Sequence, residues 1–302
     1  MNISLGIVGV PNAGKSTLFN ALLSRQMAQV ASFPFTTIEP NVGVIPVPDE
    51  RLEKLSQLLS PKTTTPASVE FIDIAGLIKG AHEGEGLGNQ FLGKIREVAA
   101  IIHIVRQFTN PDVSHYYETI YPLRDIEIVN LELELGGIKK PTIYVLNLSE
   151  DQLKEQSWPS KIKVGEEEIE LLPICAKLEA DLADFLAEER RQYLKEMGIG
   201  ESGLDKLIKK AYQLLGLITF YTIKGGKEVR AWSLPQGETA LSAADKVHTD
   251  MAKGFIKAEV VGFEDLIKYR DWREAAEAGK VRLEGKEYVM REGDVVEFKF
   301  NI

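Results

Sequence analysis

The chain has 302 residues and a net charge of −9 at neutral pH, which argues against holding nucleic acid by charge alone, although a local basic face stays open. Its single cysteine, Cys175, has no internal partner for a disulfide, which favours a reducing compartment. No apolar run approaches the roughly 18 residues of a membrane span, and the N-terminus lacks the basic start of a signal peptide, so we expect a cytoplasmic protein without membrane contact.

The first two thirds of the chain alternate short apolar runs with helical patterns. The apolar runs predict buried strands at residues 3–10, 69–75, 100–105 and 142–147. Amphipathic spacing predicts helices at residues 15–23, 52–59, 89–99, 123–135, 178–197 and 204–215. This alternation predicts right-handed βαβ units, and hence an α/β domain with a mostly parallel sheet flanked by helices.

The pattern changes near Gly216. Short β-rich runs at 218–223, 228–233, 256–261, 281–283 and 295–300 surround one helical stretch at 240–250. We therefore predict a first domain over residues 1–216 and a small α+β domain over residues 217–302. Acidic and basic residues nearly balance in the second domain, which permits an RNA-facing surface. Its aromatic residues Trp232, Phe255 and Phe263 are interpreted as core rather than as base-stacking groups.

A phosphate-binding motif follows the first predicted strand. GVPNAGKS (residues 9–16) matches G-x-x-x-x-G-K-S, whose glycines let backbone N–H groups surround phosphate oxygens at a helix N-terminus. Lys15 is expected to reach the β- and γ-phosphates, and the Ser16 hydroxyl to ligate Mg²⁺. The nucleotide-binding residues predicted here are Asn12, Ala13, Gly14, Lys15, Ser16 and Thr17.

Two further segments follow in the order found in nucleotide switches. FPFTTIEPN (residues 33–41) offers Thr37, whose hydroxyl is expected to reach Mg²⁺ and the γ-phosphate, and DIAG (residues 73–76) ends a strand. Asp73 is expected to hold Mg²⁺ through water, and the Gly76 N–H to meet the γ-phosphate. Loops that are held only by a γ-phosphate and its metal collapse on hydrolysis, so these segments predict a switch.

The residue after DIAG leaves the hydrolysis step open. Leu77 stands where many GTPases have a water-orienting Gln, and it can neither donate nor accept a hydrogen bond. His82 is the predicted substitute and completes a catalytic set with Lys15 and Gly76. The alternative is that His82 is an exposed loop histidine without a role. Without such a group, hydrolysis stays slow until a partner supplies one.

VLNLSE (residues 145–150) stands where an N-K-x-D motif would bind guanine. Leu148 replaces the Lys whose stem covers the base, and Glu150 is one methylene longer than the guanine-binding Asp. The sequence therefore predicts lost guanine recognition, with Asn147, Leu148 and Glu150 at the base. ICAK (residues 174–177) follows another apolar run, and a backbone N–H at Cys175 or Ala176 is predicted to face the base. A plain strand end is the alternative for this segment.

These motifs, with several longer strings, resemble the YchF / Obg-like ATPase family of P-loop nucleotidases. Three strings from the C-terminal part resemble the family's TGS domain, a small β-grasp-like module. The resemblance implies a preference for ATP, slow hydrolysis with Mg²⁺, contact of the Leu148 backbone with adenine, and the large ribosomal subunit as partner, with RNA contact through the TGS domain. The strings are DIAGLIKGAHEGEGLGNQFL (73–92), HIVRQF (103–108), RDIEIVNLEL (124–133), KEVRAW (227–232), HTDMAKGFIKAEV (248–260) and REGDVVEFKFN (291–301).

Three questions stay open at this point. The family usually has a long helical arm where this chain has only GGIKKP (residues 136–141), as a natural short form or with the arm replaced by Gly-Gly. Obg-type relatives also imply a K⁺ ion beside the phosphates with Asn12 as a ligand, and the alternative is that Asn12 only shapes its loop. The rival functions are an Obg-type GTPase and a non-catalytic ribosome- or RNA-binding adaptor.

Overall fold

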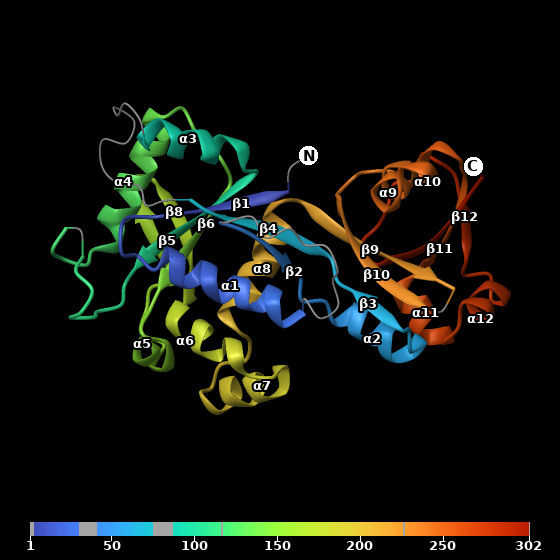
Figure 1. Cartoon of the computed structure of the whole chain (residues 1–302), viewed down its shortest axis with the longest axis horizontal. Coiled ribbons are helices and arrows are strands. Elements are labelled where there is room, and N and C mark those ends of the chain that lie inside the picture. The colour runs from blue at the N-terminus through green and yellow to red at the C-terminus, as the bar shows by residue number, and fades with distance from the viewer. Residues whose placement is uncertain (1–2, 30–40, 75–86, 116, 226, 302) are drawn as a thin grey trace. The chain divides into compact units, whose positions relative to one another are not determined.

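The computed structural model describes residues 3–29, 41–74, 87–115, 117–225 and 227–301 (Figure 1). The chain forms two compact units. The first comprises Met1–Ile45 and Val69–Leu214, and the second comprises Pro46–Ser68 and Leu215–Ile302. The sequence prediction had a single boundary near Gly216 and placed residues 46–68 in the first domain, so it was wrong for that segment.

Residues 46–68 belong to the second unit because they pair with its sheet. Strand β3 (Thr63–Thr65) runs parallel to β10 (Glu228–Pro235). The Tyr221 hydroxyl donates a hydrogen bond to Asp49 Oδ2 at 2.6 Å, and Arg51 forms an ion pair with Glu292. These contacts join residues far apart in sequence, which hydrophobic periodicity alone does not reveal.

The first unit is a seven-stranded sheet with the strand order β2-β4-β1-β5-β6-β8-β7. The pairs from β4 to β8 are parallel, and the edge strand β7 is antiparallel to β8. Figure 1 shows α1 and α3 on opposite sides of the sheet, so the predicted α/β fold is confirmed. The elements are β1 (Ser4–Val8), α1 (Lys15–Gln29), β2 (Val42–Pro46), β4 (Ser68–Asp73), α3 (Leu87–Glu97), β5 (Ala100–Arg106), α4 (Pro122–Leu135), β6 (Thr142–Asn147), α5 (Glu150–Glu155), β7 (Lys161–Val164), β8 (Glu167–Ile174), α6 (Ala176–Asp181), the 3₁₀ turn η2 (Leu182–Asp184), α7 (Ala187–Glu196) and α8 (Gly203–Leu214).

The central strands β1 and β5 place the motifs at one edge of this sheet. Every residue of both strands is buried, as expected where helices cover both faces of a parallel sheet. The phosphate motif, DIAG, VLNLSE and ICAK follow the carboxyl ends of β1, β4, β6 and β8. Open α/β sheets bind their ligands at this edge.

The helix predicted over residues 178–197 is interrupted in the structure. It divides into α6, η2 and α7, with extended backbone at Phe185 and Leu186. Leu182 is buried, whereas Leu186, one turn further on, is 71% exposed. The apolar residues therefore do not stay on one face of a continuous helix.

The connection between α4 and β6 is short and closed. Gly137 has a φ of +66°, and the Ile138 N–H returns to the last turn of α4 at 2.8 Å. The Lys140 ammonium donates to the Arg96 carbonyl at the end of α3 (2.8 Å). Arg96 in turn donates to the Gly136 carbonyl at 2.9 Å. Residues 136–141 therefore form a hydrogen-bonded turn against α3.

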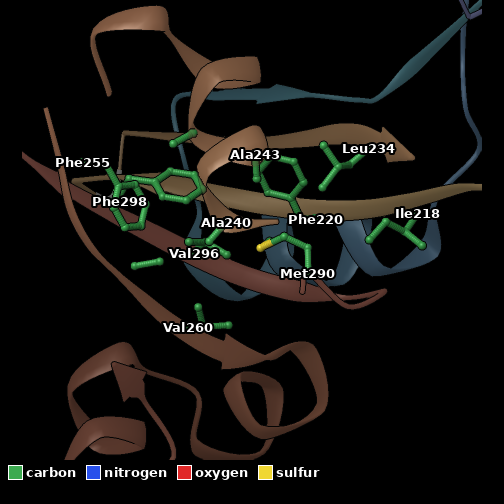
Figure 2. Packing of buried hydrophobic residues seen from close by; sticks show 12 residues of the cluster. Ile218, Phe220, Leu234, Ala240, Ala243, Phe255, Val260, Met290, Val296 and Phe298 are labelled. Atoms are coloured by element: carbon green, nitrogen blue, oxygen red, sulfur yellow. The ribbon is translucent and has the colours of Figure 1, made fainter. Parts of the chain in front are cut away.

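The second unit is a six-stranded sheet with the order β12-β11-β13-β9-β10-β3. Figure 2 shows Phe220, Phe255 and Phe298 of the sheet gathered beside Ala240 and Ala243 of α9, and these residues belong to one buried cluster. The elements, besides β3 and β10, are α2 (Glu50–Leu59), β9 (Leu217–Lys224), α9 (Ala240–Val247), α10 (Thr249–Lys253), β11 (Phe255–Gly262), α11 (Phe263–Tyr269), α12 (Trp272–Glu277), β12 (Arg282–Glu284) and β13 (Asp294–Phe300).

The aromatic residues singled out in this unit are packed. Phe255 and Phe263 are buried. Trp232 stacks with Phe220 at a centroid distance of 6.4 Å and donates its Nε1–H to the Thr222 hydroxyl at 2.9 Å. This agrees with their interpretation as core residues.

Within the described ranges, none of the helices has both the length and the apolar character that crossing a bilayer requires.

Candidate functional site

The loop between β1 and α1 has the geometry of a phosphate cradle. Asn12 and Gly14 adopt positive φ angles of 60° and 100°. A Cβ on Gly9 would lie 2.4 Å from the Ile104 carbonyl oxygen, so only glycine fits this close to β5. Helix α1 begins at Lys15, directly after the loop, so the unpaired N–H groups of its first turn face the same place. Such an arrangement binds anionic oxygens.

Lys15 supplies a cation to this cradle. Its side chain is buried, and Nζ donates to the carbonyl oxygens of Gly9 (3.1 Å) and Val10 (2.9 Å). Burial lowers the pKa of Lys15 to about 8, and the nearby Asp73 carboxylate acts in the opposite direction. A bound phosphate would favour the charged ammonium, because an adjacent anion raises the pKa of a lysine.

Ser16 and Asp73 lie together beside Lys15. Asp73 ends β4 and pairs with Ile7 of β1, and its carboxylate is hydrogen-bonded to the Ser16 side chain. Burial raises the pKa of Asp73, while Lys15 and the hydrogen bond from Ser16 oppose that shift. The structure thus brings together two of the three residues predicted to hold Mg²⁺, a hydroxyl and a carboxylate of the kind that this ion prefers.

The described part of the chain offers only these two side chains to an ion at this point. Among the described residues, no group of three or more His, Cys, Asp or Glu side chains is arranged around one point. Mg²⁺ usually keeps several waters and binds through one or two protein groups and substrate phosphates, so a two-residue site fits it.

The remaining switch and catalytic predictions lie outside the described residues. They concern Thr37, Gly76 and His82, together with Leu77 in the position of the water-orienting Gln. Their roles stay predictions.

Asn147 ties the phosphate loop to the ICAK segment. Its Nδ2 donates to the Ala13 carbonyl at 2.9 Å, and its Oδ1 accepts from the Ala176 N–H at 3.0 Å. The residue is 4% exposed, and a Cβ on Gly14 would come within 2.2 Å of its Nδ2. Asn147 therefore braces the site through contacts within the protein, and glycine at position 14 leaves the room that this brace needs.

Leu148 does not take the place of a base-covering lysine. Its side chain is 2% exposed and packs with Val105, Ile126 and Leu171 in a hydrophobic cluster. Its N–H donates to the Ile174 carbonyl at 2.8 Å, so its carbonyl is the backbone group that remains for a ligand. The buried side chain agrees with the predicted loss of a base-covering group at this position, and the contact of the Leu148 backbone with adenine stays a prediction.

Glu150 is the first residue of α5. It accepts a hydrogen bond from the Lys154 ammonium, one turn further along the helix, at 2.7 Å. Its side chain is 41% exposed. Glu150 therefore already has a cationic partner on its own helix.

The ICAK segment uses one of the two N–H groups that were predicted to face the base, that of Ala176. The Ala176 N–H is bonded to Asn147, so it is not available to a ligand. The Cys175 sulfur accepts from the Leu178 N–H at 3.5 Å and caps α6, and burial raises the pKa of its thiol. This segment acts as a support for Asn147, which the sequence pattern did not indicate.

Phe108 is a residue that sequence reasoning missed. The N–H groups of Gln107 and Phe108 donate to the Asn147 carbonyl at 2.9 and 3.1 Å. The backbone of Phe108, whose side chain is half-buried, therefore lies beside the VLNLSE loop. Its signal was present in HIVRQF, where an aromatic residue directly follows a buried strand at the ligand-binding edge of the sheet.

Asn12 contacts the same loop from the phosphate side. Its amide nitrogen donates to the Ser114 carbonyl at 3.1 Å. The segment after β5 thus touches both the P-loop and the VLNLSE loop.

Comparisons with known proteins agree with this geometry. Residues 4–148 match the family model described as "50S ribosome-binding GTPase", and residues 217–301 match the YchF-GTPase C-terminal model, described as a protein of unknown function. The chain is 41% identical to the "Ribosome-binding ATPase YchF" of Escherichia coli O157:H7 over 365 aligned positions that cover 100% of both proteins. It is also 41% identical to the protein of the same name from Bacillus subtilis (strain 168) over 368 positions, again covering 100% of both.

A solved structure supports the same relationship. The "Structure of the Schizosaccharomyces pombe YchF GTPase" has a TM-score of 0.84 and 30% sequence identity, and covers 99% of this chain and 98% of that chain. The alignments to the bacterial relatives are longer than the 302 residues present here, so those relatives have positions without a counterpart in this chain.

Proposed function

This chain belongs to the YchF family, and from that premise we propose that it is an ATPase that binds ATP with Mg²⁺ in its first unit and works on the ribosome. The observation that carries the proposal is the convergence of Lys15, Ser16 and Asp73 on the phosphate cradle. A buried ammonium, a hydroxyl and a carboxylate at a helix N-terminus are the groups that a triphosphate and its metal require.

The roles at the phosphates follow from these positions. The N–H groups of the P-loop and of the first turn of α1 hold the phosphate oxygens, with Ala13, Gly14 and Thr17 in that stretch. Lys15 binds the β- and γ-phosphates. Ser16 holds Mg²⁺ directly, and Asp73 holds it through water. The ion, when bound, neutralises charge that develops on the phosphates.

The preference for ATP is supported by what the base loop lacks. Guanine needs an acceptor for its N1–H and N2–H₂ groups, but Asn147 is bonded to the protein on both sides and Glu150 is paired with Lys154. The Leu148 carbonyl can accept from the 6-amino group of adenine, whereas it would face the O6 acceptor of guanine. The Phe108 ring offers a surface for stacking either purine.

The hydrolysis step and the partner complete the proposal. His82, with Lys15 and Gly76, positions the attacking water, and Leu77 explains slow turnover in the absence of a partner. The large ribosomal subunit is the partner, which places the protein in the cytoplasm, and the second unit contacts RNA. K⁺ beside the phosphates, with Asn12 as a ligand, is a further element of the proposal.

The test is ATP turnover with and without ribosomes, using Lys15→Ala as the inactive control. We expect slow turnover that ribosomes accelerate, and co-sedimentation with ribosomes that persists at moderate salt, because a chain with a net charge of −9 must bind through shape or a local patch. Ribosome binding without any ATP turnover would favour the non-catalytic adaptor. Preferential binding of GTP in competition would favour the GTPase.

A further inference from the structure

Arg106 is a buried cation whose hydrogen bonds go to main-chain carbonyls. It is the last residue of β5 and is 1% exposed. Its Nε donates to the Phe108 carbonyl at 3.1 Å and its Nη2 to the Val113 carbonyl at 2.8 Å. Its Nη1 donates to the Ser114 carbonyl at 3.2 Å. Burying a guanidinium is costly, and its rigid fork fixes several acceptors at once, so Arg106 sets the shape of the turn that follows β5.

The same guanidinium lies against the Phe108 ring. Its central carbon is 4.3 Å from the ring centroid, within the range of a cation–π contact. The Phe108 backbone is held separately, because its N–H donates to the Asn147 carbonyl. Arg106 therefore fixes the orientation of the Phe108 ring, on a residue whose backbone is bonded to the VLNLSE loop.

The far part of this loop is anchored separately. The His115 Nε2 lies 2.9 Å from Asp125 Oδ2 on α4, and the Tyr117 N–H donates to His115 Nδ1 at 3.1 Å. The Ser114 carbonyl has a second donor in Asn12. Removing Arg106 would therefore release Phe108 first, while Ser114 keeps its contact with the phosphate loop.

We propose that Arg106 is a positioning residue for purine binding, which holds the Phe108 ring as the stacking surface for the base without touching the nucleotide itself. The inference rests on the proposed function, in which the base of ATP lies at the VLNLSE loop. Arg106 then contributes to the affinity for the nucleotide indirectly, by supporting the face of the Phe108 ring that is turned away from the base.

The test compares two ligands that share phosphates but not a base. Calorimetry with Mg²⁺ measures the binding of ATP and of inorganic tripolyphosphate to the full chain and to Arg106→Gln. We expect the affinity for ATP to fall about tenfold or more, as for loss of a base–aromatic stack. The affinity for tripolyphosphate should stay within about twofold, because the phosphate loop keeps its own hydrogen bonds. A merely structural role would weaken both ligands together.

Two further variants keep the test decisive if Arg106→Gln folds poorly. Phe108→Ala removes the ring itself and should give the same split between ATP and tripolyphosphate. Arg124→Gln is the matched control, since Arg124 holds the Thr119 carbonyl and hydroxyl in the distal part of the same loop. It should leave both affinities unchanged.

The outcomes separate the inference from the proposed function. If the unmodified chain binds ATP no better than tripolyphosphate, no base is bound and the proposed function fails with the inference. If the chain prefers ATP but Arg106→Gln and Phe108→Ala keep its affinity, or lose both ligands in parallel, only the inference is overturned.

Discussion

The two ends of the candidate site use their side chains differently. At the phosphate end, Lys15, Ser16 and Asp73 converge on one place, and their bonds are to each other or to nearby carbonyls that a ligand can replace. At the base end, Asn147 and Leu148 are turned into the protein, one as a brace and the other as core.

This difference indicates how affinity and selectivity are divided. The phosphate end provides charged groups that any nucleoside triphosphate can use. In the proposed function the base end provides a rigid frame, a carbonyl and an aromatic ring, so we expect selectivity to come from backbone and shape rather than from a charged side chain. A sequence motif lists side chains. It therefore predicts the groups at the phosphate end well and the groups at the base end poorly.

Loss of the buried cation should be the largest single effect. Lys15→Ala should weaken ATP binding by about a hundredfold or more, because removing one partner of a desolvated charge pair costs about 2–5 kcal/mol. Calorimetry measures the affinity, and turnover should disappear with it. Lys206→Ala, at an exposed position in α8, is the control and should bind ATP normally. Unchanged ATPase activity in a folded Lys15→Ala protein would refute the phosphate site.

Restoring the guanine motif should damage the protein instead of switching its base preference. Leu148→Lys with Glu150→Asp recreates Asn-Lys-Ser-Asp, but position 148 lies in a cluster with Val105 and Leu146, where an ammonium cannot be hydrated without repacking. We expect the free energy of unfolding to fall by about 2–4 kcal/mol. Urea denaturation measures this fall.

The single Glu150→Asp variant is the control for the double change. It keeps a carboxylate at an exposed position and should unfold like the parent. A stable double variant with a tenfold shift towards GTP would show that the loop does select the base through these side chains.

Removing the brace should affect both purines alike. Asn147→Ala leaves the Ala176 N–H and the Ala13 carbonyl without their partner, at about 1–3 kcal/mol for each buried group. We expect a loss of about 2–6 kcal/mol in unfolding free energy and similar losses of affinity for ATP and GTP. Competition binding measures the ratio of the two affinities. A large change in that ratio with unchanged stability would mean that Asn147 contacts the base directly.

The parts that could be predicted from the sequence are the local ones. The glycines, Lys15 and Ser16 fall within eight residues, and the order of the following motifs placed Asp73 beside them. Strands β1, β4, β5 and β6 of the first unit follow from continuous apolar runs, whereas β2 and β7 were not predicted. By contrast, the brace at Asn147 joins residues 13, 147 and 176, and the burial of Leu148 depends on packing against α4 and β5. Such contacts between distant segments leave little trace in periodicity.

The same reason explains the misplaced segment 46–68. Strand β3 has the sequence Thr-Thr-Thr, without apolar alternation, and it is formed by parallel pairing with Glu228, Val229 and Arg230. Nothing within residues 46–68 indicates that partner. Propensity alone therefore placed the segment with its neighbours in sequence.

His103 lies on the central strand β5, between the strands that carry the two ends of the site. Replacing it should have the smallest effect on stability at neutral pH. Its ring is fully buried 5.4 Å from the Tyr144 ring, and neither ring nitrogen has a hydrogen-bond partner within the described ranges. Burial lowers the pKa of His103 to about 3, and the charge of Lys15 acts in the same direction. The histidine is therefore neutral in the folded protein.

The sign of the resulting pH dependence follows from proton binding in the two states. Below about pH 6.5 the unfolded chain binds a proton at His103 that the folded chain does not, so stability falls as the pH drops towards 3, by up to about 1.4 kcal/mol per pH unit. His103→Leu should match the parent at pH 7 and lose less stability between pH 7 and pH 5, by about 1–2 kcal/mol. Urea denaturation at both pH values measures the difference, with the exposed His248→Leu as a control that should keep the parent's pH dependence. If His103→Leu shows the same loss as the parent, then His103 takes up its proton in the folded state, and the centre of the sheet is less isolated from water than its burial indicates.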